Sequence, residues 1–132
     1  MTTEEMKTLE RRFFQAWNED KPEILDEVYA PTFINHFNGE NLDAVKQGII
    51  TVRAAFSDFH LTLDDQIAEG DKLVSRWTAR GVHSGVFLGI AATGKHVEVT
   101  GIGISRFENG KIVEAWSLTD FFGLLRQMGA LP

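Results

Sequence analysis

One carboxylate near the end of the chain, Asp120, lies in a strongly apolar stretch. Most of its neighbours in the segment WSLTDFFGLL (116–125) are aromatic or aliphatic. Burying an unpaired charge among such side chains would cost several kcal/mol, so the carboxylate needs a specific role. An apolar surrounding raises the pKa of a carboxyl group towards the range of a general base. Alternatively, an aspartate at a strand-to-helix junction caps the helix or pairs with an arginine, and the sequence leaves these interpretations open.

Two of the four histidines are candidates to assist such a carboxylate. His36, in FINHF (33–37), shares alternate positions with Ile34, which favours an inward imidazole that acts as an acid, a base or a hydrogen-bond donor. A satisfied interior or loop histidine is the alternative. His83 follows a set of uncharged alternate positions and would line the same interior. No histidine pair has metal-ligand spacing and no carboxylate cluster accompanies one, so no metal site is expected.

Aromatic residues from separate segments could enclose an apolar pocket. Trp17, Trp77 and Trp116 are either core residues or the wall of such a pocket. The glycine-rich segment GVFLGIAATGK (85–95), which contains Phe87, lacks the spacing of a phosphate-binding loop. We interpret it as a mobile rim over the cavity.

Composition restricts the class of protein and its partners. The length of 132 residues suits a single domain, 1–132, with a hydrophobic core. The net charge of −6, without a lysine- or arginine-rich cluster, argues against nucleic acid or an anionic membrane as partner. The absence of cysteine excludes disulfides and thiolate chemistry. The start MTTEEMKTLE has no apolar signal segment, so a cytoplasmic location is expected.

The periodicity of apolar residues predicts helices first and strands afterwards. Helical spacing covers 3–18, a short segment after Pro22, and 42–57. Alternation with a period of two then predicts strands around 59–63, 73–83, 96–107 and 111–122. Asn109-Gly110 is a strong hairpin signal between the last two. The order predicts an α+β domain, with three N-terminal helices on one face of a strongly curved antiparallel sheet.

The hairpin also predicts which side chains share a face. Counting outward from Asn109-Gly110 sets Gly103 opposite Trp116 and Val99 opposite Asp120. Trp116, Leu118 and Asp120 would then project from one face, over small residues that let the sheet bend.

Four segments together form a pattern that covers most of the chain: YAPTFINH, FSDFHLTLDDQIAEGDKLV, the segment from RWTARGVH to VEAW, and the closing GLLRQMGALP. On these segments, nearly the whole chain resembles the SnoaL-like polyketide cyclase family of the nuclear transport factor 2-like superfamily. The resemblance implies a cone-shaped fold around a ligand cavity, usually as a homodimer, without cofactor or metal. The chain departs from many relatives at Ala115, where they have histidine.

The resemblance implies that Asp120 is the acid/base for an intramolecular aldol ring closure on a small apolar or polyketide-like molecule. It maps His36, more loosely, onto a second functional position. The expected ligand-binding residues are Trp17, Trp77, His83, Phe87, Trp116 and Leu118. Three alternatives remain: a non-catalytic ligand-binding cone, an isomerase or dehydratase of the same superfamily, and an assembly module with an exposed apolar patch.

Overall fold

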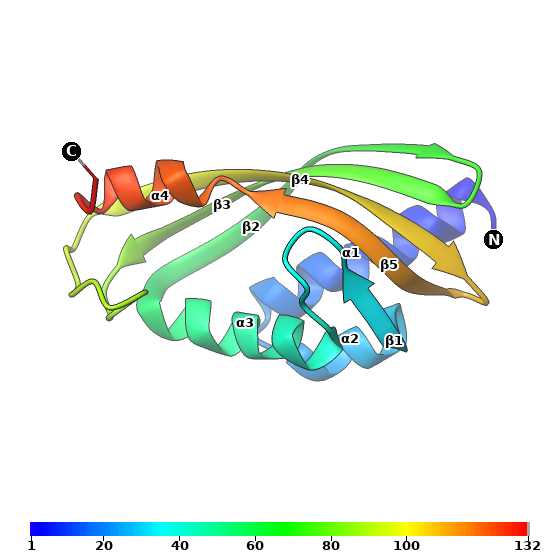
Figure 1. Ribbon diagram of the computed structural model, residues 1–132, viewed down its shortest axis with the longest axis horizontal. Coiled ribbons are helices and arrows are strands. Elements are labelled where there is room, and N and C mark those ends of the chain that lie inside the picture. Colours follow the sequence, from blue (N-terminus) through cyan, green and yellow to red (C-terminus); the bar gives the residue numbers. More distant parts are fainter. Residues whose placement is uncertain (132) are drawn as a thin grey trace.

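The computed structural model describes residues 1–131, which form a curved sheet with helices against its concave face (Figure 1). The first helix, α1 (Thr3–Asn18), begins at a capping box in which the Thr2 hydroxyl and the Glu5 side chain each accept a hydrogen bond from the other's backbone. A 3-10 turn, η1 (Pro22–Ile24), and the short α2 (Leu25–Val28) follow. The sequence predicted both helical segments.

Within the described residues 1–131, five strands form one sheet in the order β1-β5-β4-β3-β2. Their bounds are β1 Tyr29–Asn35, β2 Phe56–Glu69, β3 Lys72–His83, β4 His96–Glu108 and β5 Lys111–Thr119. Four of them pair antiparallel, as expected, but β1 pairs parallel with β5. The expectation of a wholly antiparallel sheet was therefore wrong at one edge. There β1 and β5 are neighbours in the sheet, although β2, β3 and β4 separate them in the sequence.

Two further helices complete the cone. The third, α3 (Leu42–Ala55), begins at Asn41, whose side chain accepts the Ala44 N–H. The fourth, α4 (Phe121–Gln127), continues from β5 at the end of the molecule opposite the N-terminus (Figure 1). Helices α1 and α3 lie under the concave face, so the α+β class is confirmed. No helix among residues 1–131 is long and apolar enough to cross a membrane.

A β-bulge changes the predicted hairpin register. Asn109 and Gly110 form the turn, and Glu108 faces Lys111 as predicted. Phe107 faces Ile112, but the next residue on β4, Arg106, faces Glu114, so β5 contains one extra residue. Because side chains alternate, one extra residue moves all later side chains of β5 to the opposite face.

Because of the bulge, the β5 side chains that were predicted to face the cavity point outwards. Gly103 lies opposite Ser117 rather than Trp116, and Trp116 pairs with Ile104. Trp116 and Leu118 therefore share the outer, convex face with Ile104. Beyond the bulge, alternation directs Ala115, Ser117 and Thr119 of β5 into the cone, and before it Ile112 is fully buried.

Candidate functional site

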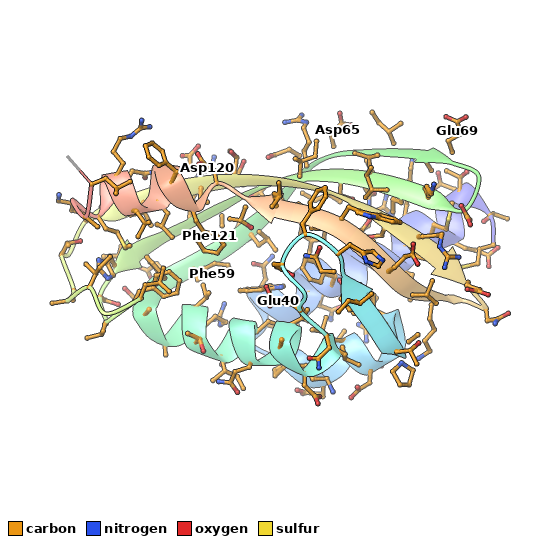
Figure 2. All side chains as sticks on the ribbon, viewed as in Figure 1. Glu40, Phe59, Asp65, Glu69, Asp120 and Phe121 are labelled. Atoms are coloured by element: carbon orange, nitrogen blue, oxygen red, sulfur yellow. The ribbon has the colours of Figure 1, made fainter. Side chains whose placement is uncertain are left out.

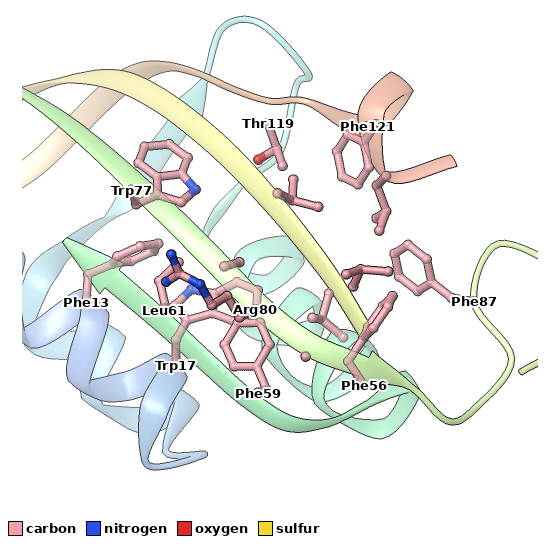
Figure 3. Close-up of a pocket in the computed structure, with 16 residues that line it drawn as sticks. Phe13, Trp17, Phe56, Phe59, Leu61, Trp77, Arg80, Phe87, Thr119 and Phe121 are labelled. Atoms are coloured by element: carbon pink, nitrogen blue, oxygen red, sulfur yellow. The ribbon is translucent and has the colours of Figure 1, made fainter. Parts of the chain in front are cut away.

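A cavity of about 170 Å³ lies between the concave face of the sheet and the helices (Figure 3). Figure 3 shows Phe13 and Trp77 at one end and Phe87 and Phe121 at the other. Residues from α1, α3, α4, four strands and the loop after β3 contribute to its wall. They are Phe13, Trp17, Val52, Phe56, Phe59, Leu61, Trp77, Ala79, Arg80, Gly81, Phe87, Val97, Val99, Thr119, Phe121 and Leu124.

Aromatic contacts hold the wall in shape. Trp17 of α1 packs on Phe59 of β2 with ring centroids 5.5 Å apart. Phe87 packs edge-on against Phe56 at 5.1 Å and is only 6% exposed. Such pairs contribute roughly 0.5–1.5 kcal/mol beyond the area they bury. The segment 85–95 is thus tied to the cavity through Phe87.

The side chains that line the cavity are almost all apolar. Within residues 1–131, its only charged side chain is Arg80, whose Nε lies 3.2 Å from a carboxylate oxygen of Glu98. Thr119 supplies a hydroxyl, and no carboxylate or imidazole belongs to the described lining. The wall therefore favours an uncharged, largely hydrophobic ligand.

Asp120 does not line this cavity; it belongs to a separate, open depression that Ile102 and Leu118 also line. It is exposed, and its Oδ1 accepts the Gly123 N–H at 2.8 Å, so it caps α4. Its chain neighbours Thr119 and Phe121 both line the cavity, and Figure 2 shows Asp120 beside Phe121 where β5 passes into α4. The capping contact that the sequence left open is present. The burial of Asp120 that was expected among apolar side chains is absent, because the bulge in β5 moves the later side chains to the opposite face.

His36 lies on the outer face, away from the cavity. Its ring stacks on Trp116 with centroids 5.1 Å apart, and its Nε2 is 3.8 Å from Glu114 Oε1. The His36 N–H donates to the Ala115 carbonyl, five residues before Asp120 on β5, which corresponds to roughly 16 Å of extended strand. The structure does not bring the two predicted catalytic residues together.

The expected ligand-binding residues divide into two groups. Trp17, Trp77 and Phe87 line the cavity. Trp116 and Leu118 do not, because both project outwards, and Leu118 is 56% exposed.

His83 does not belong to the described lining either. It is fully buried behind Phe56, with ring centroids 5.4 Å apart, and its Nδ1 lies 3.0 Å from the Thr93 hydroxyl. Its position matches a structural interior histidine.

Comparison with known proteins identifies the family. The model of the SnoaL-like polyketide cyclases matches residues 7–128. The chain belongs to the SnoaL-like polyketide cyclase family. The solved structure of TsrD from Streptomyces laurentii is 34% identical to this SnoaL-like chain, covers 99% of both chains and has a TM-score of 0.89. No curated protein matches the sequence.

Two further solved structures resemble this SnoaL-like chain at 27% identity. AclR from Streptomyces galilaeus, a candidate hydroxylase, covers 99% of this chain and 100% of its own, with a TM-score of 0.88. IdmH from Streptomyces antibioticus, a candidate polyketide cyclase, covers 94% and 98%, with a TM-score of 0.79. The expected cone-shaped fold of the nuclear transport factor 2-like superfamily is confirmed.

Several cavity residues of this SnoaL-like domain escaped the sequence analysis. Phe13 lies in the helical segment predicted for 3–18 but was not singled out, although it lies one turn before Trp17 and therefore on the same side of the helix. Phe59 follows Asp58, whose positive φ of 53° accompanies an irregularity in β2 that alternation alone does not predict. Phe121 was placed in the apolar run around Asp120, but its role as the rim of the cavity depends on the bulge.

Proposed function

We propose that this SnoaL-like protein binds a small, largely apolar molecule in the cone and acts on it by acid/base chemistry through Asp120. The observation that carries the proposal is the aromatic cavity, whose lining includes both chain neighbours of Asp120, Thr119 and Phe121. Family membership supports a small-molecule ligand. A polyketide-like ring system fits both the apolar wall and the family.

The size of the cavity limits the enclosed part of that molecule. A volume of about 170 Å³ is close to that of an engineered cavity of roughly 150 Å³ that binds benzene. One aromatic ring would therefore be enclosed. The remainder of a longer substrate would pass Phe121, which is 49% exposed, towards Asp120.

In the proposed reaction, Asp120 removes a proton α to a carbonyl of the bound molecule. Its Oδ1 is held by the Gly123 N–H, while Oδ2 makes no hydrogen bond within residues 1–131 and would take the proton. The carbanion attacks a second carbonyl of the same molecule, a carbon–carbon bond forms, and the resulting alkoxide recovers the proton from Asp120. The apolar wall would bring the two reacting carbons together.

The base role can be tested without the native substrate. An aryl methyl ketone fits the enclosed volume, and exchange of its methyl protons for deuterium in D₂O reports removal of an α proton. We expect the protein to accelerate exchange and Asp120→Asn to lower the acceleration by about 10²–10⁴-fold. Asp65→Asn, at an exposed carboxylate on β2, is the matched control and should leave exchange unchanged.

A ligand-binding cone without catalysis is the second candidate. The lack of any acid/base group in the described cavity lining favours it. Ketone binding without accelerated exchange in the parent protein would support this candidate and overturn the role of Asp120.

Two expectations about partners and location stay predictions. We propose a homodimer through the outer face of the sheet, because Ile102 and Leu118 are 51% and 56% exposed there. Monomeric soluble proteins rarely expose large contiguous apolar patches. The cytoplasmic location expected from the N-terminal sequence also stays a proposal.

A further inference from the structure

A carboxyl group lies buried between α1 and the sheet, apart from the proposed reaction. Glu10 of α1 is 7% exposed and points at the inner face of β3 and β4. The Ser75 hydroxyl donates to Oε2 at 2.7 Å, and the Ser105 hydroxyl donates to Oε1 at 3.1 Å. These two hydrogen bonds connect the helix to the two central strands.

No cation accompanies this carboxyl group. Among residues 1–131, no lysine, arginine or histidine nitrogen lies within 4.0 Å of it. The titratable group that faces it is Tyr29 of β1, whose pKa is raised well above 10 by burial and by Glu10. Gln66 of β2, which is neutral, also approaches it, and its Nε2 is buried without a hydrogen-bond partner.

Burial without a counter-ion changes the protonation of Glu10. Removal from water raises its pKa to about 7, although the hydrogen bonds from Ser75 and Ser105 act in the opposite direction. The Glu10 carboxyl group of the folded protein therefore changes its protonation state near neutral pH.

The position of Glu10 links that proton to the cavity wall. Phe13 and Trp17 follow it at three and seven residues, so all three lie on one face of α1. Phe13 and Trp17 line the cavity. We propose that Glu10 is a proton-controlled latch: protonated, it holds α1 and its aromatic side chains against β3 and β4, and ionised, it loosens that contact.

The latch predicts a specific dependence of stability on pH. A carboxyl group with a raised pKa in the folded state contributes full stability below its unfolded pKa and loses it as pH rises. The unfolding equilibrium constant should therefore rise about 80-fold between pH 4.5 and 7 from this group alone.

Urea unfolding of the full chain from pH 4.5 to 8 tests the latch. Glu10→Gln keeps the shape of the side chain and removes the titration, so this pH dependence should disappear from the variant. Glu23→Gln, at an exposed glutamate, is the matched control and should follow the parent protein. An unchanged profile in Glu10→Gln would overturn the proposal.

A second variant keeps the test decisive if Glu10→Gln fails to fold. Ser75→Ala removes a hydrogen bond that lowers the pKa of Glu10, so the midpoint of the carboxyl titration, followed by carbon-13 NMR, should rise. A merely structural hydrogen bond would leave the midpoint in place. Titration of Glu10 near 4.5 in the folded protein would also overturn the latch.

Amide exchange tests the movement of α1 separately from ligand binding. For amides of residues 11–17, the exchange rate of the parent protein relative to Glu10→Gln should grow by about 10–30-fold from pH 5.5 to 8. Intrinsic exchange rates cancel in this ratio. A constant ratio would show that ionisation does not loosen α1, and neither result depends on the proposed reaction.

Discussion

The indole of Trp77 in β3 occupies the space that a side chain at Gly101, its directly paired residue in β4, would need. A Cβ at position 101 would overlap three ring atoms of Trp77. The missing side chain therefore lets the indole lie across the neighbouring strand and form one end of the cavity. Glycine matters at position 101 because it lacks a side chain, and not because its backbone is more flexible.

Gly101→Ala should displace Trp77 into the cavity. Overpacking of this kind costs about 1–3 kcal/mol, so the urea midpoint should fall and binding of a neutral aryl probe should weaken. Gly48→Ala is the matched control, because Gly48 of α3 is half-buried and a Cβ there would meet no atom of the described residues within 4 Å. It should stabilise the protein by about 0.5–1 kcal/mol. Equal behaviour of the two variants would contradict the packing of Trp77 on Gly101.

Phe87→Ala should enlarge the cavity at its open end. Loss of a buried phenylalanine typically costs about 3–5 kcal/mol in the free energy of unfolding, and the space should favour two-ring over one-ring probes. Leu88→Ala is the neighbouring control, because Leu88 is 64% exposed. Its effect should stay within about 0.5 kcal/mol. Probe selectivity that is identical in the two variants would argue against Phe87 as a cavity wall.

Two substitutions of Asp120 should separate its contribution to stability from its contribution to proton removal. Asp120→Ala removes the cap of α4 and should cost about 1 kcal/mol in thermal or urea unfolding. Asp120→Asn retains an acceptor for the Gly123 N–H, so its stability should remain close to that of the parent while α-proton exchange falls. A purely capping role predicts that Asp120→Asn behaves like the parent in both measurements.

Leu118→Lys should weaken the proposed dimer. The substitution places a charge in the exposed apolar area of the outer face, and sedimentation should show a shift to monomer at micromolar concentration. Val86→Lys changes a residue that is 69% exposed in the loop after β3 and serves as the control. A parent protein that is already monomeric would contradict the proposed interface.

The sequence predicted the elements better than the faces they present. Periodicity placed the three N-terminal helices, and the Asn109-Gly110 pair placed the turn, because these depend on local preferences within one segment. The last strand was predicted to run to residue 122, but it ends at Thr119 and α4 begins at Phe121. The bulge after Ile112 depends on pairing between β4 and β5, and no local residue pattern identifies it. That extra residue reversed the expected directions of Trp116 and Leu118.

The candidate site was also predicted only in part, because local sequence patterns do not reveal the pairing of distant strands. Trp17, Trp77 and Phe87 were expected at the cavity and line it. Trp17 and Trp77 lie in a helix and a strand that periodicity predicted, and Phe87 lies in the loop that was interpreted as the rim. His36 was expected inside, but the parallel pairing of β1 with the edge of β5 places it beside Trp116 on the outer face. Long-range pairing, which no local sequence pattern reveals, thus determined the position of His36.

The three tryptophans give the most direct test of the proposed ligand cavity. Trp17 and Trp77 line it, whereas Trp116 stacks on His36 on the outer face. With 5-fluorotryptophan in place of tryptophan, fluorine-19 NMR should resolve one resonance for each residue, assigned by single Trp→Phe variants. On titration with naphthalene, we expect saturable shifts of the Trp17 and Trp77 resonances and an unchanged Trp116 resonance. Shifts confined to Trp116, or no saturable shift of Trp17 and Trp77, would contradict a ligand site inside the cone.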